Sequence, residues 1–183
     1  MNGANQLKMA IYNLDAMHSE ITFKVKHLMI STVTGSFTKF DATLESEAND
    51  FSDAKIKFSA EVESISTSNE QRDGHLRSAD FFDVEKFPTI SFSSTSFLHV
   101  EDREYKLIGD LTIKGVTKSV TLAVEYGGAM TDFYGQSKVG FELSAKISRA
   151  EFGLIWSAVT EAGGVVVSDE VKLILSVQLV KQS

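Results

Sequence analysis

The sequence predicts an all-β fold, an extended eight-stranded antiparallel barrel with one or two short helices. Three observations support this prediction. Apolar residues recur at every second position over most of the chain, turn-forming residues separate these runs, and few residues remain for helices. Since each strand has one apolar face that the few helices cannot cover, the sheet must curl to cover that face itself. A sandwich of two sheets is also possible, but long strands joined by hairpins favour the barrel.

The predicted strands follow one another with short interruptions, and one of them spans residues 89–100. Lys, Glu, Ser and Thr occupy most of the alternate positions, which is typical of strands with one dry and one wet face. The apolar residues of the other regular runs are Ile21, Phe23 and Val25; Ile56, Phe58, Ala60 and Val62; Leu107, Leu111 and Ile113; Val120, Leu122, Val124 and Tyr126; Val139, Phe141, Leu143, Ala145 and Ile147; and Val171, Leu173, Leu175, Val177 and Leu179.

The alternation changes parity once, in the second predicted strand. Val33 and Phe37 are in one phase, whereas Phe40 and Leu44 are in the other. A β-bulge near residues 38–39 explains this change most simply, and bulges help a sheet to curl.

Two stretches break the alternation altogether. In residues 67–85, Ser68 is a candidate N-cap for a short helix that contains residues 70–72, and a second turn follows Gly74. The other irregular stretch covers residues 149–168. Both are candidates for closing an end of the barrel.

Length and composition fit a single domain, residues 1–183, with residues 1–9 as a flexible tail. A compact fold of this size buries roughly 70% of its unfolded surface and needs no disulfide or metal. The chain has no cysteine, which excludes disulfides and thiolate nucleophiles. Its net charge is −7 and it has no Lys/Arg block, which argues against nucleic acid or an anionic membrane surface as a partner.

The first residues contain no apolar run of signal-peptide length, and no stretch reaches the roughly 18 apolar residues of a transmembrane helix. As written, the sequence predicts a cytoplasmic protein. A periplasmic location is expected only if a leader has been removed.

Six segments spread over most of the chain form a specific set in their order and spacing. They are DAMHSEITFKVKHLM (15–29), GSF (35–37), ISTSNEQRDGHLRSADFFDVEKFPTISF (65–92), GDLTIKGVTKSVTL (109–122), ISRAEFGL (147–154) and SDEVKLIL (168–175). Together they resemble the YceI family of polyisoprenoid-binding, lipocalin-like barrels. The resemblance implies a barrel that carries a polyisoprenoid, an isoprenoid quinone or a fatty-acid derivative, often as a homodimer. We expect no cofactor.

The apolar interior is the first candidate site. Each methylene transferred out of water contributes roughly 0.8 kcal/mol, so a long tail is strongly driven into such a tube. For any single residue, plain core packing is the alternative. The candidate lining residues are Phe23, Phe37, Phe58, Phe81, Phe92, Leu111, Leu122, Phe141, Phe152 and Trp156.

A polar cluster is the second candidate, because the head group of an amphiphile needs hydrogen-bond partners. The alternative is structural: Arg72, Asp73 and Asp80 could pin an irregular loop against the barrel. The head-group candidates are His18, Arg72, His75 and Ser78.

An enzyme is the competing class. The residue types of a hydrolytic triad are present in Ser78, His75 and either Asp73 or Asp80. However, these residues lie in one short segment, and no GxSxG motif occurs. The four histidines show no metal-binding spacing such as HxH or HExxH. We therefore expect a carrier without enzymatic activity, with a lipid-ester hydrolase and a barrel without a specific ligand as the alternatives.

Overall fold

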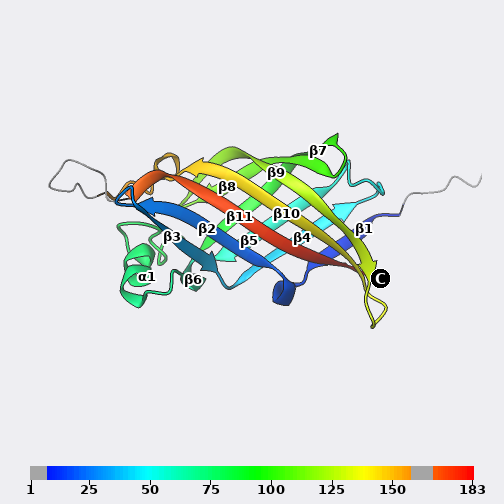
Figure 1. The fold of residues 1–183 in the computed structure, drawn as a ribbon, viewed down its shortest axis with the longest axis horizontal. Coiled ribbons are helices and arrows are strands. Elements are labelled where there is room, and N and C mark those ends of the chain that lie inside the picture. The colour runs from blue at the N-terminus through cyan, green and yellow to red at the C-terminus, as the bar shows by residue number, and fades with distance from the viewer. Residues whose placement is uncertain (1–7, 158–166) are drawn as a thin grey trace, which may run out of the picture.

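The computed structural model describes residues 8–157 and 167–183, which form an elongated antiparallel barrel (Figure 1). Its helical elements are α1 (Glu70–Arg77) and the short 3-10 turns η1 (Ala16–His18), η2 (Val62–Ser64) and η3 (Ala150–Phe152). The described strands are β1 (Ala10–Leu14), β2 (Glu20–His27), β3 (Ser31–Phe37), β4 (Phe40–Ser46), β5 (Lys55–Glu61), β6 (Ile65–Ser66), β7 (Thr89–Glu101), β8 (Glu104–Ile113), β9 (Val116–Thr131), β10 (Ser137–Ser148) and β11 (Val167–Lys181).

In the described part of the chain, these eleven strands make up an eight-stranded barrel because three long strands are each interrupted once. The turn η1 separates β1 from β2, residues 38–39 separate β3 from β4, and η2 separates β5 from β6. The strand order is β1-β4-β5-β7-β8-β9-β10-β11, and β11 pairs back with β1, where Tyr12 lies opposite Lys181. The predicted barrel, with strands adjacent in the order of the sequence, is therefore confirmed.

The strand β11 pairs with β1 near its C-terminus and with β2 along the rest of its length. The segments β2, β3 and β6 thus extend the barrel beyond its closed part, toward α1 (Figure 1). There α1 and residues 78–88 follow β6 and supply Phe81 and Phe82 to the interior. An irregular segment therefore completes the wall at this end.

The predicted change of parity falls at residues 38–39, where β3 ends and β4 begins, with Phe37 and Leu44 both buried. The strand β1 was not predicted. It is short, and its pairing with Glu45 and Leu44 of β4 fixes it more than its own composition does.

The helix α1 differs from the prediction at its start. The side-chain oxygen of Asn69, not of Ser68, accepts a hydrogen bond from the Arg72 N–H at 3.0 Å. Ser68 has φ +60°, whereas an N-cap residue is extended, as Asn69 is. The helix continues through Gly74 to Arg77, and the predicted turn begins only after it, where the Phe81 N–H donates to the Ser78 oxygen at 3.0 Å.

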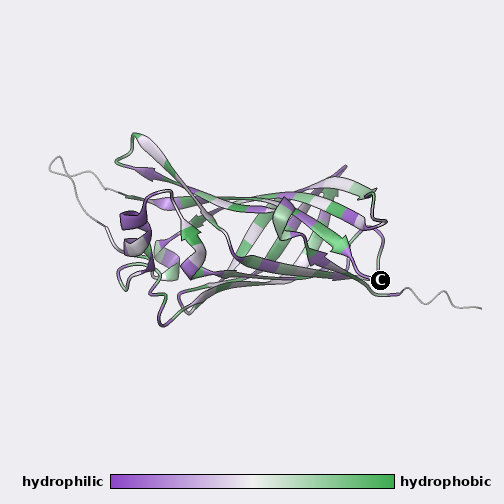
Figure 2. Cartoon of the chain, turned by 90° about the horizontal axis from the view of Figure 1, so that it is seen from below, coloured by the Kyte–Doolittle hydropathy of each residue, from purple (hydrophilic) through white to green (hydrophobic). Residues whose placement is uncertain are grey.

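Of the predicted flexible tail, residues 1–7 lie outside the described residues, as do residues 158–166 of the second irregular stretch. Hydrophobic and hydrophilic residues alternate along the strands (Figure 2), which places an apolar face inside the barrel. No helix in the described part of the chain has the length and apolar composition needed to cross a bilayer.

Candidate ligand-binding tunnel

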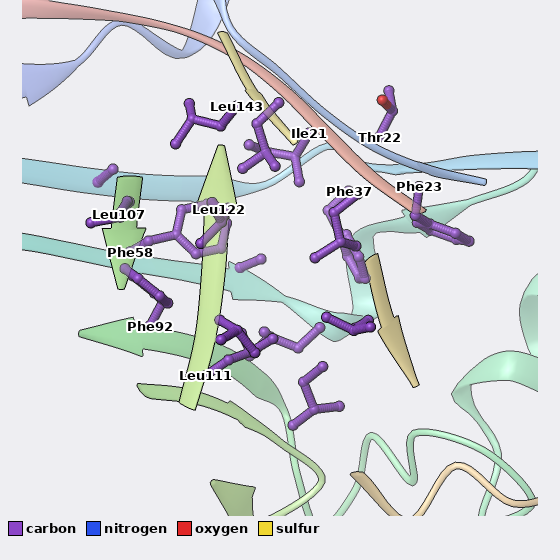
Figure 3. Close-up of a pocket in the computed structure, with 18 of the residues that line it drawn as sticks. Ile21, Thr22, Phe23, Phe37, Phe58, Phe92, Leu107, Leu111, Leu122 and Leu143 are labelled. Carbon is purple, nitrogen blue, oxygen red and sulfur yellow. The ribbon is translucent and has the colours of Figure 1, made fainter. Parts of the chain in front are cut away.

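The inward faces of the strands enclose a cavity of about 230 Å³, which we call the tunnel (Figure 3). Among the described residues, its lining is apolar except for Thr22, Thr43 and Arg149. Residues from the first half of the chain, such as Phe58, lie near residues from the second half, such as Leu122. The tunnel therefore offers hydrocarbon contacts along its length and almost no hydrogen-bond partners.

Most of the predicted lining residues are at the tunnel. Those that line it are Phe23, Phe37, Phe58, Phe81, Phe92, Leu111, Leu122 and Phe141. Phe152 and Trp156 are not part of the lining. Phe152 lies almost fully buried in η3, and Trp156 packs against Phe81 and the His75 ring, with ring centroids 5.3 and 4.8 Å apart. Trp156 therefore contacts a lining residue without lining the tunnel itself.

The outer ends of two phenylalanine rings lie over glycines of the neighbouring strand. The ring of Phe23 covers Gly35, and the ring of Phe92 covers Gly109. A Cβ atom at either glycine would overlap the ring. The absence of a side chain at these positions lets both rings lie against the wall and keeps the lumen free.

At one end, aromatic rings fill the barrel. Phe51, from the loop between β4 and β5, packs against Tyr12, Tyr126 and Phe141 with ring centroids 5.7 to 5.9 Å apart. Phe97 also packs against Phe141. Burial raises the pKa of the Tyr12 hydroxyl, with the negative charge of ionised Tyr126 as a smaller cause. We call this end of the barrel the aromatic end.

The loop that carries Phe51 is held by a carboxylate. Asp53 accepts hydrogen bonds from the Ser46 hydroxyl at 2.6 Å and from the N–H groups of Glu47 and Ala48 at 2.8 and 3.1 Å. The bond from Ser46, followed by the bond from the Glu47 N–H, lowers the pKa of Asp53. The loop is therefore most stable when Asp53 is ionised.

Toward the other end, the inward residues of β10 and β11 are only half-buried. On β11, Leu179 is buried but Leu175 and Val171 are not, and on β10 Phe141 is buried but Ile147 is not. These residues are smaller than the rings of the aromatic end and leave free space between them. We call this the wide end. It lies where β2 meets β3, near α1 (Figure 1).

Arg149 brings a charge to the wide end. Its guanidinium, mostly buried, donates to the backbone oxygens of Leu154 at 2.6 Å, Trp156 at 2.8 Å, Ser168 at 2.9 Å and Val167 at 3.1 Å. Burial lowers the pKa of Arg149, and the negative charge of Asp169 partly offsets this effect. Arg149 therefore ties the segment after η3 to the start of β11 and places a cation at an apolar wall.

The predicted head-group residues are not brought together, and none of them is in the described lining of the tunnel. His18 lies on the outer surface, where its Nδ1 bonds Asp15 at 2.8 Å. Arg72 donates to the hydroxyl and backbone oxygen of Thr67 at 2.8 and 2.9 Å. His75 comes nearest, since its ring packs against Phe81, a lining residue.

The geometry around Ser78 does not match a hydrolytic triad. Its hydroxyl donates to the backbone oxygen of His75 at 2.6 Å, whereas the His75 Nε2 bonds the carboxylate of Asp80 at 2.9 Å. Asp73 accepts instead from the N–H and hydroxyl of Thr67. The polar side chains of this segment are thus used for local structure. In residues 8–157 and 167–183, no three His or acidic side chains are grouped to hold a metal ion.

Two features of the tunnel could not be found by alternation. Phe51 stands in a stretch with turn composition, and Arg149 in an irregular stretch. Their inward positions become apparent only in the folded structure. The charge of Arg149 and the loop position of Phe51 both predict exposure when read alone.

The fold and the tunnel together define a class of protein. Its members are antiparallel barrels in which strands that follow each other in sequence are neighbours, and the barrel encloses an apolar tunnel. The YceI-like domain matches residues 12–179, so the chain belongs to the YceI-like family. A UPF0312 protein of Staphylococcus aureus strain USA300 is 39% identical over 165 residues, which cover 90% of this chain and 94% of that protein.

Solved structures agree with this assignment. The YceI protein of Campylobacter jejuni is 32% identical, with a TM-score of 0.74 over 86% of this chain and 90% of that one. Burkholderia cenocepacia BcnA has a TM-score of 0.79 at 21% identity, covering 90% and 98% of the two chains. A polyisoprenoid binding domain from Saccharophagus degradans has a TM-score of 0.68 at 17% identity, covering 93% and 98%. The last two show a shared fold.

Proposed function

We propose that the protein binds one long-chain amphiphile inside the tunnel, a polyisoprenoid, an isoprenoid quinone or a fatty-acid derivative, for carriage, storage or sequestration. The observation that carries this proposal is free space bounded by apolar side chains in the middle of a closed barrel. A fully packed core would fill such space, since voids in protein interiors are few and small. The similar domain from Saccharophagus degradans is a polyisoprenoid binding domain, which supports the same ligand class.

The tail of the ligand accounts for most of the expected binding energy. Each methylene that leaves water contributes roughly 0.8 kcal/mol, and the lining provides no polar group along most of the tunnel that would have to lose its hydration. We expect affinity to rise with tail length until the tail reaches the aromatic end, where Phe51 and Phe141 close the lumen.

The polar head of the ligand is expected at the wide end, where Arg149 is the charged side chain of the described lining. A cation there favours an oxygen-rich or anionic head over a basic one. Of the head-group residues predicted from the sequence, His75 lies behind Phe81 at the same end. A contact from His75 to the ligand stays a prediction.

Two measurements test the proposal. Mass spectrometry of an organic extract from the purified protein should find a long-chain lipid. Leu122→Lys, which puts an ammonium group into the tunnel wall, should abolish uptake of a fluorescent fatty-acid probe. Its neighbour Thr121 points outward and is exposed, so Thr121→Lys is the matched control and should bind as the wild type does.

A folded Leu122→Lys protein that binds the probe with wild-type affinity would show that the ligand does not occupy the tunnel. A wild-type protein that hydrolyses lipid esters, with activity lost in Ser78→Ala, would favour the hydrolase instead.

A further inference from the structure

The turn between β2 and β3 carries three exposed apolar residues, Leu28, Met29 and Ile30, with exposed fractions of 39%, 65% and 87%. Leu28 and Met29 have φ angles of +53° and +62°, the left-handed region that favours Gly and Asn. The sequence thus keeps large apolar side chains at the tip of a hairpin where the backbone favours small or polar residues. We call Leu28, Met29 and Ile30 the apolar tip.

The apolar tip belongs to the wide end of the tunnel. His27, just before it, pairs with Val167 at the start of β11, and Val167 lines the tunnel. Ile155, in the segment that Arg149 holds against Val167, is 72% exposed. Exposed apolar side chains from two segments therefore flank the wide end of the barrel.

Lysines gather on the outer wall next to the apolar tip. Lys146 of β10 lies directly opposite Lys172 of β11, and Lys172 lies directly opposite Lys24 of β2. Lys26 follows on the same face of β2. All four are exposed, and the facing carboxylate is that of Glu170, 3.5 Å from the Lys146 ammonium.

Like charges directly opposite each other on neighbouring strands are unfavourable for folding. Three lysines in such a row, on a chain of net charge −7, are therefore a local inversion of the charge of the protein. The nearby Asp169 bonds the Ser148 hydroxyl and the Ala150 N–H, and its charge acts on Arg149. We call Lys24, Lys26, Lys146 and Lys172 the lysine row.

We propose that the wide end docks on an anionic lipid bilayer, with the apolar tip and Ile155 inserted among the lipids and the lysine row facing their phosphates. Stable docking needs both the apolar residues and the lysine row. Three or four apolar residues alone bind a bilayer weakly, and lysines near an anionic membrane add attraction that depends on salt. The sequence has no Lys/Arg block because the row is assembled from residues far apart in the chain.

Docking in this orientation would bring the tunnel to the layer that holds long-chain amphiphiles. It does not require a ligand in the tunnel, so its failure is distinguishable from failure of the proposed binding function. Leu122→Lys, which blocks the tunnel, should leave docking unchanged.

The test is flotation of the full chain with phosphatidylcholine vesicles that contain about one-third phosphatidylglycerol, against pure phosphatidylcholine vesicles. We expect the anionic vesicles to carry the protein at low salt and to release most of it at about 0.5 M NaCl, where screening shortens to a few ångströms. Lys24→Glu with Lys172→Glu should lower the bound fraction about tenfold or more.

The decisive variant is Leu28→Asn with Met29→Gly, which gives the turn the residues that its backbone favours. It should raise the melting temperature and abolish flotation. If the tip had only a structural role, the same change would leave flotation intact. Phe133→Ser is the matched control, because Phe133 is fully exposed in the turn between β9 and β10 at the opposite end (Figure 1) and should not affect flotation.

Three results would overturn the proposal: no flotation of the wild type with anionic vesicles, wild-type flotation of the Leu28→Asn, Met29→Gly protein, or loss of flotation in Phe133→Ser. A second copy of this chain is the other occupant to consider. If the tip variant turns a dimer into a monomer in sedimentation velocity and leaves flotation unchanged, the tip is a subunit interface and not a membrane contact.

Discussion

The two ends of the barrel share the same strands but differ in how the inward residues fill the interior. At the aromatic end, Phe51, Phe97 and Phe141 pack ring against ring, and a loop residue fills the centre. At the wide end, β10 and β11 present Ile147, Val171 and Leu175, which remain half-buried. The rings of Phe23, Phe37 and Phe82 also pack together there, but they do not fill the centre. A barrel of eight strands has a nearly fixed bore, so the size of the inward side chains decides whether it is packed or hollow. One fold therefore provides a packed core at one end and a cavity in its interior.

The largest expected effect tests this difference with the same substitution on one strand. Leu179→Ala, in the packed part, should reduce the free energy of unfolding by about 3 kcal/mol, because it leaves a cavity among close neighbours. Leu175→Ala, four residues earlier on the same face, should cost only about 1–2 kcal/mol, because both leucines border the tunnel but Leu175 is only half-buried and has fewer close neighbours to lose. Urea denaturation of both variants provides the measurement. Equal losses would mean that the wide end is packed as tightly as the aromatic end.

The sequence predicted the residues that line the tunnel better than the segments that close its two ends. Alternation identified the inward faces, and eight of the ten predicted lining residues do line the tunnel, since side-chain direction in a strand follows from position. It failed where direction depends on partners far away. Arg149 faces inward because backbone oxygens on both sides of residues 158–166 bind it. The polar residues of α1 resembled a head-group site, but Thr67 and Asp80 bind them locally.

A smaller effect should appear at the aromatic end when its loop is loosened. Asp53→Asn removes the charge that accepts three hydrogen bonds and places an amide N–H against backbone donors, which should cost about 1 kcal/mol at this exposed site. The signal to follow is near-ultraviolet circular dichroism, since Phe51 should lose its fixed contacts with Tyr12 and Tyr126. Asp169→Asn, at the wide end, is the control and should leave that signal unchanged.

The effect of Asp53 on stability should also depend on pH, in a direction that its pKa fixes. Because the folded-state pKa of Asp53 is lowered by the Ser46 hydroxyl, its contribution is complete above the unfolded value of about 4 and is lost as the pH falls through the lower folded value. The difference in melting temperature between wild type and Asp53→Asn should therefore be largest at neutral pH and shrink below about pH 4. A difference that grows on acidification would contradict this role.

The smallest expected change in stability comes with a large change in binding, at Gly35. Its added methyl group in Gly35→Ala would overlap the free end of the Phe23 ring, which can swing into the lumen, so we expect a stability loss below about 1 kcal/mol. The displaced ring should narrow the wide end and weaken binding of a fatty-acid probe by about tenfold. Phe23→Leu in the same protein should restore binding.

Gly109→Ala is the contrast, because there the methyl group also meets the backbone oxygen of Ser93 at 2.6 Å. This oxygen cannot move without separating β7 from β8. That variant should lose stability whether or not a ligand is present. If Gly35→Ala binds the probe as the wild type does, Phe23 has room to move without entering the tunnel, and the bore at the wide end is not set by the rings that lie over glycine.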